Sequence, residues 1–418
     1  VVPTGQLSSI AAKDSFVPGP RNAGNESSTS ADDVAVRKGV DDFDRSLIPV
    51  AGANKAVDIP EMWQHSFDNG ISILGAQSVE TPTTSVLLKI PAGHYYTTKN
   101  KAGTAGLVVS MFRESTTERS AEDMSKALQK LGSSVYISAG NRYLNINISS
   151  LTKNLDATLS LVNEQLRAPA FLESEFERVK NNAIQGALNN KKDAGYLAST
   201  AYRQLLNADN IAAMPSSGSE ESLTNISLED VKAFYQQQVK PFGGQLIAVS
   251  DLGQAELTKS LSILENWQGK GAGLQLSLPE GNGKMGAIYL VNKDDAAQSV
   301  IRIGKRSMTQ DITGEYYKSS LMNFALGGAF NSRINLNLRE DKGYTYGARS
   351  YFNGGKLSGY YTATAEVRAD ATDKSIVEFI NEIKDYSERG ITDEELIFMR
   401  NSINQKDALK YETPRAKL

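Results

Sequence analysis

Apolar positions along the chain either alternate with polar ones or recur at helical spacing, and this pattern predicts its elements. Residues 142–148 alternate, with Leu144, Ile146 and Ile148 on one face, which is typical of a strand buried on one side. Residues 152–166 carry an apolar residue at every third or fourth position, which predicts an amphipathic helix. The same criteria predict strands at 71–76, 84–90 and 244–249 and helices at 103–113, 120–132, 173–191, 194–208, 228–238 and 253–266.

The order of predicted elements then starts again. The segment SVLLKI at 85–90 and the segment SVIRIG at 299–304 occupy the same place in the two rounds. We interpret this as an internal duplication, because in each round the segment precedes helices and then further strands. The second round has predicted strands at 287–291, 299–303, 345–352 and 358–367, and helices at 314–326, directly after 326–330, at 371–388 and at 392–410.

Stretches rich in glycine, proline and serine separate the predicted domains. Residues 1–57 show little periodicity and are predicted to be a linker or connector, and residues 268–284 form a Gly-rich joint. Residues 58–267 are the first predicted domain. Residues 285–418 are the second, which is expected to be truncated, because it lacks counterparts of the last elements of the first. The predicted fold class is α+β, with two homologous domains that each have an antiparallel-rich sheet and helices packed on one face.

Composition excludes several classes of function. The 45 basic and 48 acidic residues are interspersed and give a formal net charge of -3, so no nucleic-acid partner is expected. No run of about 18 apolar residues is present, so no membrane span is expected. The chain has no cysteine, which excludes disulfides, thiolate catalysis and cysteine-containing zinc sites. Its two histidines, His65 and His94, are expected to be surface or hydrogen-bonded residues and not metal ligands.

Candidate chemistry gathers in the segment LGGAFNSRINLNLREDKGYTYG at 326–347. The two glycines at its start predict a sharp turn before a helix, and Gly343 predicts the end of that helix. Arg339 lies on the predicted helix, and Tyr346 lies on the extended stretch that follows it. Judged from these residues alone, the segment is a helix-to-strand turn with solvated charges.

This segment closely resembles the second-domain signature of the pitrilysin/insulinase-like zinc metallopeptidases, which are inverzincins. The shared features are the Gly-rich loop, a Phe, Ser-Arg, Leu-Arg-Glu, Lys-Gly and a Tyr. Three other stretches also resemble this family: AAQSVIRIG (296–304), ISLEDVKAFYQQQVKPFGGQLIAVSDL (226–252) and GTAGLVVSMFRESTTERSAEDM (103–124). The resemblance extends over residues 60–418 and implies two metallopeptidase-like domains of one fold.

The region that would hold the metal departs from the family pattern. The family's helix carries His-x-x-Glu-His, in which two histidines bind zinc and the glutamate activates water. The corresponding positions here are Gly106, Val109 and Ser110. The family's third ligand, a glutamate on a later helix, corresponds to Val179 or Gly186. Because none of these residues can bind zinc, no metal is expected in this chain, and the chain alone is expected to be inactive.

Arg339 and Tyr346, in contrast, fit the family pattern. The resemblance implies that they reach from the second domain toward the zinc-bound substrate of another half. Peptide hydrolysis places negative charge on the carbonyl oxygen, and a guanidinium and a phenol can both donate to that oxyanion. The alternative is that Arg339 pairs with Glu340 or Asp341 at a solvated helix end.

The resemblance therefore predicts the non-catalytic half of a zinc-dependent peptidase. Such a half completes a chamber for unfolded peptide and supplies Arg339 and Tyr346 to a zinc-bearing N-terminal half. Residues 44–71 resemble the connector of single-chain members, which favours the C-terminal half of a longer bacterial peptidase in the periplasm or cell envelope, or otherwise in the cytoplasm. Two alternatives stay open: a separately encoded non-catalytic subunit of a heterodimeric processing peptidase, and a purely structural scaffold derived from the family.

Overall fold

The computed structural model describes residues 44, 47, 59–274, 281, 283–407 and 410–417. Every helix and strand named below belongs to the unit Asn54–Leu418. The linker predicted over 1–57 therefore lies outside the described residues, apart from Asp44 and Leu47, and so does the central part of the predicted joint.

The first sheet has six strands in the order β1-β2-β6-β3-β5-β4. Its strands are β1 (Met62–Ser66), β2 (Ser72–Gln77), β3 (Thr83–Ile90), β4 (Ser134–Ala139), β5 (Leu144–Leu151) and β6 (Gln245–Ser250). Neighbouring strands run antiparallel except for β2 and β6. In β5, Leu144, Ile146 and Ile148 are buried, which confirms the alternation predicted for this strand.

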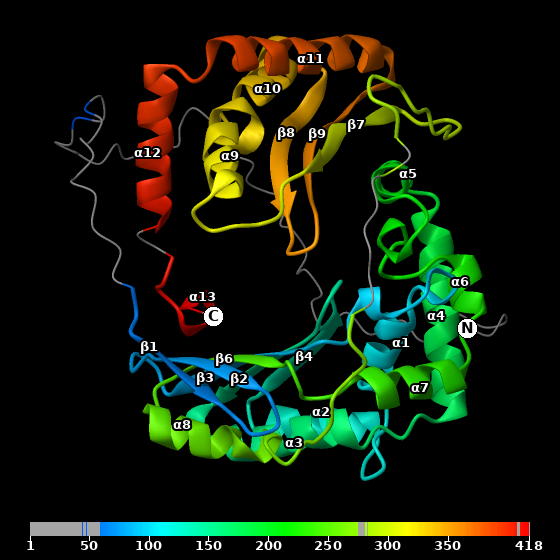
Figure 1. Ribbon diagram of the computed structural model, residues 1–418, viewed down its shortest axis with the longest axis vertical. Helices are drawn as coiled ribbons and strands as arrows, with labels where there is room; N and C mark the ends of the chain where they lie inside the picture. The colour runs from blue at the N-terminus through cyan, green and yellow to red at the C-terminus, as the bar shows by residue number, and fades with distance from the viewer. Residues whose placement is uncertain are drawn as a thin grey trace, which may run out of the picture. The chain divides into compact units, whose positions relative to one another are not determined.

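Helices α2, α3 and α8 lie along one face of this sheet (Figure 1). The helices of this part are α1 (Thr104–Met111), α2 (Ala121–Lys130), α3 (Leu155–Arg167), α4 (Glu173–Asn190), α5 (Ala194–Asn207), α6 (Glu220–Thr224), α7 (Leu228–Gln238) and α8 (Gln254–Leu261). Ser120 caps the first turn of α2, and Ser227 and Asp230 form a capping box at the start of α7. The apolar stripe of α3 contributes Leu155, Leu159 and other buried residues to one large core.

The second sheet has three antiparallel strands in the order β7-β9-β8. Its strands are β7 (Gln298–Ser307), β8 (Thr345–Gly354) and β9 (Gly359–Arg368), and its helices are α9 (Glu315–Asn323), α10 (Arg333–Asn335), α11 (Thr372–Arg389), α12 (Asp393–Asp407) and α13 (Pro414–Lys417). Helix α11 contacts β7 and β9 (Figure 1). Between these strands and helices lies a second core, which includes Ile301, Leu338 and Phe379.

Short helical segments connect these elements. They are the 3-10 helices η2 (His94–Tyr96), η3 (Lys99–Lys101), η4 (Thr152–Asn154), η5 (Ile211–Ala213), η6 (Ser262–Leu264) and η9 (Ala369–Ala371), and the π-helices η7 (Phe324–Gly328) and η8 (Leu336–Asp341). Across the residues that the structure describes, no helix is both long and apolar enough to cross a membrane.

Three strands of the first sheet repeat the order of the three strands of the second sheet. In the first, β3 lies beside β5, and β4 forms the edge; in the second, β7 lies beside β9, and β8 forms the edge. In both, the middle strand is the second strand of a hairpin and leads into two long helices, α3 and α4 or α11 and α12. This correspondence supports the duplication. The domain boundaries at 58–267 and 285–418 stay predictions.

One local prediction is wrong, and two predicted helices are present but continue as π-helices. Residues 287–291 form no strand, because no neighbouring strand pairs with them, and Leu290 stays 91% exposed. The helix predicted over 314–326 is α-helical only to Asn323 and continues as the π-helix η7. The helix predicted after the Gly-rich break is a single α-helical turn, α10, followed by the π-helix η8. The edge strands β1 and β4 were not predicted, because edge strands have weaker apolar alternation.

Candidate functional site

Helix α1 carries the positions at which the family has its metal motif. The Val109 side chain is buried, with 4% exposed, and packs in the first core. The Ser110 hydroxyl donates a 3.0 Å hydrogen bond to the carbonyl of Gly106 one turn earlier, so its proton is used within the helix. A Cβ at Gly106 would meet no atom within 4 Å. The helix therefore keeps its place in the fold but offers no metal ligand.

Helix α4, which contacts α1, carries the two positions that correspond to the third ligand. Val179 is 7% exposed and belongs to the first core, while Gly186 has no atom near its missing Cβ. A zinc site needs three protein ligands with nitrogen, oxygen or sulfur donors, and these residues do not supply them. Within the described part of the chain, no group of three or more His, Asp or Glu residues could hold a metal ion.

The two histidines make hydrogen-bond and ring contacts, and the 3-10 helix η2 that contains His94 touches α1. His94 is 1% exposed, and its Nε2 lies 3.0 Å from the carbonyl oxygen of Ile211. Burial lowers the pKa of His94 below its usual value, and backbone hydrogen bonds to Ile211 and Met214 oppose that effect. His65 lies on β1 and makes an edge-to-face contact with Phe67 at 5.6 Å between ring centroids.

Arg339 lies on the π-helix η8, and two contacts hold its guanidinium. The Cζ atom lies 4.6 Å from the centroid of the Phe330 ring, within the range of a cation–π interaction. The Nη1 atom lies 2.8 Å from Oε1 of Glu340, with 34% of the arginine side chain exposed. A π-helix is rare and occurs frequently at functional sites. The guanidinium is therefore oriented, but it remains open to solvent on one side.

Tyr346 projects from a β-bulge near the start of β8. The register of β8 against β9 shifts between Thr345 and Ala348, so Tyr346 and Gly347 together stand opposite the single residue Glu366. The Thr345 hydroxyl donates a 2.6 Å hydrogen bond to the Glu366 carbonyl and accepts one from the Gly347 amide at 3.1 Å. The tyrosine is 92% exposed. Bulges commonly re-aim a side chain at a functional edge.

The structure does not bring Arg339 and Tyr346 into direct contact. For these two described residues, no hydrogen bond or ring contact joins the side chains, and the contacts of Arg339 are those with Phe330 and Glu340. Their convergence on a common substrate atom stays a prediction.

Arg333, the other arginine of the signature segment, has a structural role. Its Nε and Nη2 atoms donate to the two carboxylate oxygens of Glu395 at 2.6 and 2.7 Å, and its Cζ lies 4.7 Å from the ring centroid of Tyr386. Nη2 also donates to the Gly390 carbonyl at 3.0 Å. Arg333 thereby joins α10 to α11, to α12 and to the turn between them.

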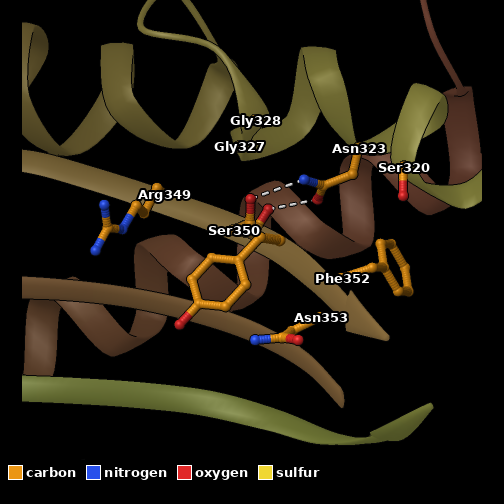
Figure 2. A pocket seen from close by; sticks show the side chains of 9 residues that line it. Ser320, Asn323, Gly327, Gly328, Arg349, Ser350, Phe352 and Asn353 are labelled. Carbon is orange, nitrogen blue, oxygen red and sulfur yellow. Dashed lines mark hydrogen bonds between the residues drawn. The ribbon is translucent and has the colours of Figure 1, made fainter. Parts of the chain in front are cut away.

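A cavity of 610 Å³ lies beside β8 (Figure 2). Its lining residues come from α9, η7 and β8: Ser320, Asn323, Gly327, Gly328, Arg349, Ser350, Tyr351, Phe352 and Asn353. Asn323 and Ser350 are almost fully buried. Asn323 Nδ2 donates to the Ser350 carbonyl at 2.7 Å, and the Ser350 hydroxyl donates to Asn323 Oδ1 at 2.6 Å. The sequence analysis missed both residues, although the neighbouring Gly-Gly pair indicated a close approach of two backbones.

Comparisons with known proteins agree with this geometry. The family described as "Insulinase (Peptidase family M16)" matches residues 73–213, and the family described as "Peptidase M16 inactive domain" matches residues 225–403. The chain is 26% identical over 340 residues to the "Non-peptidase homolog YmxG" of Helicobacter pylori, which covers 81% of this chain and 78% of that protein.

Two solved structures show the same fold. The peptidase M16 inactive domain from Pseudomonas fluorescens has a TM-score of 0.72 and 21% identity, covering 83% of this chain and 85% of that one. The periplasmic protease PqqL from Escherichia coli has a TM-score of 0.67 and 16% identity, covering 86% of this chain but 42% of that one. The chain belongs to the insulinase-type peptidase family M16 and is similar to its non-peptidase members.

Proposed function

We propose that this chain is the non-catalytic half of an M16 zinc peptidase, completing a chamber for unfolded peptide around a zinc-bearing half. The observation that carries the proposal is the exposure of Tyr346, 92% of whose surface is open on a bulge of β8. A fold that needed only stability would have no reason to hold a tyrosine ring in water at the cost of a broken strand ladder.

The chemistry of the pair fits the charge that peptide hydrolysis creates. A guanidinium is always charged, and a phenol is a hydrogen-bond donor at neutral pH. Arg339 and Tyr346 would donate to the carbonyl oxygen of a substrate bound at the other half's zinc. Losing one such donor costs about 2.7–4 kcal/mol of transition-state stabilisation, which corresponds to about a hundredfold or more in turnover.

The relatives support two arrangements of the halves. The inactive-domain structure from P. fluorescens has a similar length, since the match covers 85% of it, and this supports a separate subunit. PqqL is matched over 42% of its length, which supports a half within a longer chain. PqqL is also described as periplasmic, and the periplasm or cell envelope is the location we propose for this chain.

The test is turnover of an unfolded fluorogenic peptide by this chain combined with the zinc-bearing M16 half or subunit of the same organism. We expect Arg339→Ala or Tyr346→Phe to lower kcat about a hundredfold, with the zinc content of the partner unchanged. Arg368→Ala is the matched control, because Arg368 is an exposed arginine that pairs with Asp370. Near-normal turnover with both test variants would contradict the proposal.

A scaffold without a role in turnover is the second candidate. It is favoured by the ion pair between Arg339 and Glu340, which satisfies the guanidinium within the chain. Substitution Glu340→Gln separates the two candidates. For a scaffold it changes nothing in turnover, whereas for an active pair it frees the guanidinium and alters kcat.

A further inference from the structure

A polar contact joins α5 to one face of the second sheet. The Tyr202 hydroxyl lies 2.9 Å from the Tyr361 carbonyl, to which it donates, and 3.0 Å from the Thr362 hydroxyl. The Tyr360 hydroxyl donates a 2.6 Å hydrogen bond to Oδ1 of Asn207. Helix α5 therefore meets β7 and β9 through tyrosines and amides and not through an apolar core.

Two arginines lie in this contact with unused donors. Arg302 on β7 donates from Nη2 to the Ser199 hydroxyl at 2.7 Å, but its Nε is buried without an acceptor. Arg203 is four residues after Ser199 and therefore on the same side of α5. Its Nη1 is also buried without an acceptor. Among the described residues, no ion pair within 4.0 Å joins a carboxylate to either arginine. Glu366 lies on the same face of the sheet as Arg302, and its Oε1 would be 3.8 Å from a Cβ at Gly195 of α5.

The negative charge present near these two positive charges is that of Glu366, which pairs directly with neither arginine. Burial lowers the pKa of the Arg203 guanidinium, and the charge of Arg302 acts in the same direction, against the opposite effect of nearby tyrosines. Burial raises the pKa of Tyr95 to about 12, so this phenol is neutral at physiological pH and adds no negative charge near Arg203. The cluster therefore has two guanidinium groups with unused donors and no direct ion pair.

We propose that Arg203 and Arg302 form a binding site for an oxyanion of the carboxylate or phosphate type, at the contact between α5 and the second sheet. Buried donors nearly always have a partner, and an orphaned one indicates a missing water or ion. A buried charge without a counter-charge is costly, so an anion gains more there than a water does. Guanidinium groups match the planar or tetrahedral oxygens of such anions with paired hydrogen bonds.

The site has consequences that require no zinc-bearing partner. Its ligand would bridge α5 and β7, so binding should stabilise the folded chain. The source of the oxyanion is either a free anion or the carboxylate of a peptide held against the second sheet. Both present the same oxygens to the same two guanidinium groups.

The first experiment uses the full chain and inorganic phosphate, exchanged for chloride at constant ionic strength. We expect the melting temperature to rise to a plateau and calorimetry to give a saturable phosphate isotherm. Arg203→Gln or Arg302→Gln should weaken phosphate binding at least about thirtyfold, because each removes one of two buried charged donors. Arg368→Gln is the matched control, since Arg368 is an exposed arginine at the end of β9 that pairs with Asp370, and it should leave the isotherm unchanged.

Circular dichroism establishes that each variant is folded, and Arg203→Lys, which keeps the charge, provides a second variant with partial retention of binding. An unchanged phosphate isotherm in Arg203→Gln would overturn the site. So would the absence of any phosphate effect on the parent chain, if a peptide carboxylate also fails to bind.

The second experiment separates the two sources. Fluorescence anisotropy compares one labelled peptide with a free carboxyl end and the same peptide as its amide. Preference for the free acid, lost in Arg203→Gln and competed by phosphate, assigns the site to a peptide carboxylate. Equal binding of acid and amide together with a saturable phosphate isotherm assigns it to a free anion, and both results support an oxyanion site.

Discussion

The helices that precede the hairpin differ between the two sheets, although the strand order is the same. In the first, α1 is a regular helix. Val109, at the position that the resemblance assigns to the base, and Val179, at one of the two candidate positions for the third ligand, are part of the core. In the second, α9 runs into one π-helix, a second π-helix carries Arg339, and a bulge exposes Tyr346. The first region packs these positions into an apolar core, whereas the second has irregular features that packing alone does not require.

The edge strands β8 and β4 differ in how many of their backbone groups are hydrogen-bonded by side chains from outside the sheet. Side chains from outside the sheet cover the backbone of β8: Asn335 accepts from one amide at 2.9 Å, Asn323 donates to a carbonyl at 2.7 Å and Tyr316 donates to another at 3.2 Å. On β4, within the described part of the chain, Arg113 donates a hydrogen bond to one backbone carbonyl. When the backbone groups of an edge strand are hydrogen-bonded by side chains, another strand cannot pair with them. The edge strand β8 is therefore less available for such pairing than β4.

Gly327→Ala is the substitution that tests this comparison most severely. A Cβ at this position would lie 2.5 Å from the backbone nitrogen of Ser350, and a backbone atom cannot move aside as a flexible side chain can. We expect a loss of about 3 kcal/mol in the free energy of unfolding, measured with urea. A loss below about 0.5 kcal/mol would show that η7 and β8 are not held as closely as the structure indicates.

Arg333→Ala should cost about 2 kcal/mol, because it removes paired hydrogen bonds to the charged Glu395. The hydrogen bond from Arg333 is the main reason that the pKa of Glu395 lies below its usual value of 4.5. A lowered carboxyl pKa contributes stability above the unfolded value and loses it as the pH falls through the folded value. The difference between parent and variant should therefore be full at neutral pH and shrink below about pH 4. An equal difference at pH 7 and at pH 3 would contradict this role.

Asn323→Ala removes two hydrogen bonds with Ser350 and leaves a buried carbonyl of β8 without its donor. We expect the free energy of unfolding to fall by about 1–2 kcal/mol. Ser320→Ala is the control from the same cavity, because its hydroxyl bonds within its own helix, and it should change stability by less than about 0.5 kcal/mol. Equal effects of the two substitutions would mean that Asn323 does not hold the edge of β8.

Gly106→Ala and Gly186→Ala should have the smallest effects and the opposite sign. Both glycines lie within helices of the first region, with no atom near the added Cβ. Alanine restricts the unfolded chain and favours the helix, so each variant should gain about 0.5–1 kcal/mol. Thermal unfolding measures the gain. A loss of stability would show that the added methyl groups meet other atoms and that the space at these positions is not open.

The sequence by itself determined many of the element types, the repeated order and the lack of zinc-binding side chains at the positions of the family's metal motif. Helical spacing in 152–166 and alternation in 142–148 are local patterns, and the structure confirms both as α3 and β5. Gly106 and Val109 have no side-chain donor atoms whatever the fold, so the lack of a zinc ligand at the first and of a base at the second follows from covalent chemistry alone. The signature around Arg339 is also a local sequence pattern, and the resemblance of several stretches of the chain to one family identifies it.

Only the tertiary structure decided which of these residues are exposed, paired or orphaned. Residues 287–291 are apolar enough to predict a strand, but no neighbouring strand completes their backbone hydrogen bonds. The bulge at Tyr346 depends on the register of β8 against β9. The unused donors of Arg203 and Arg302 depend on a contact between residues about 100 positions apart, as the bond from Arg302 to Ser199 shows. Hydrogen-bond satisfaction and the burial of charge are properties of non-local neighbours, and no spacing along the chain specifies them.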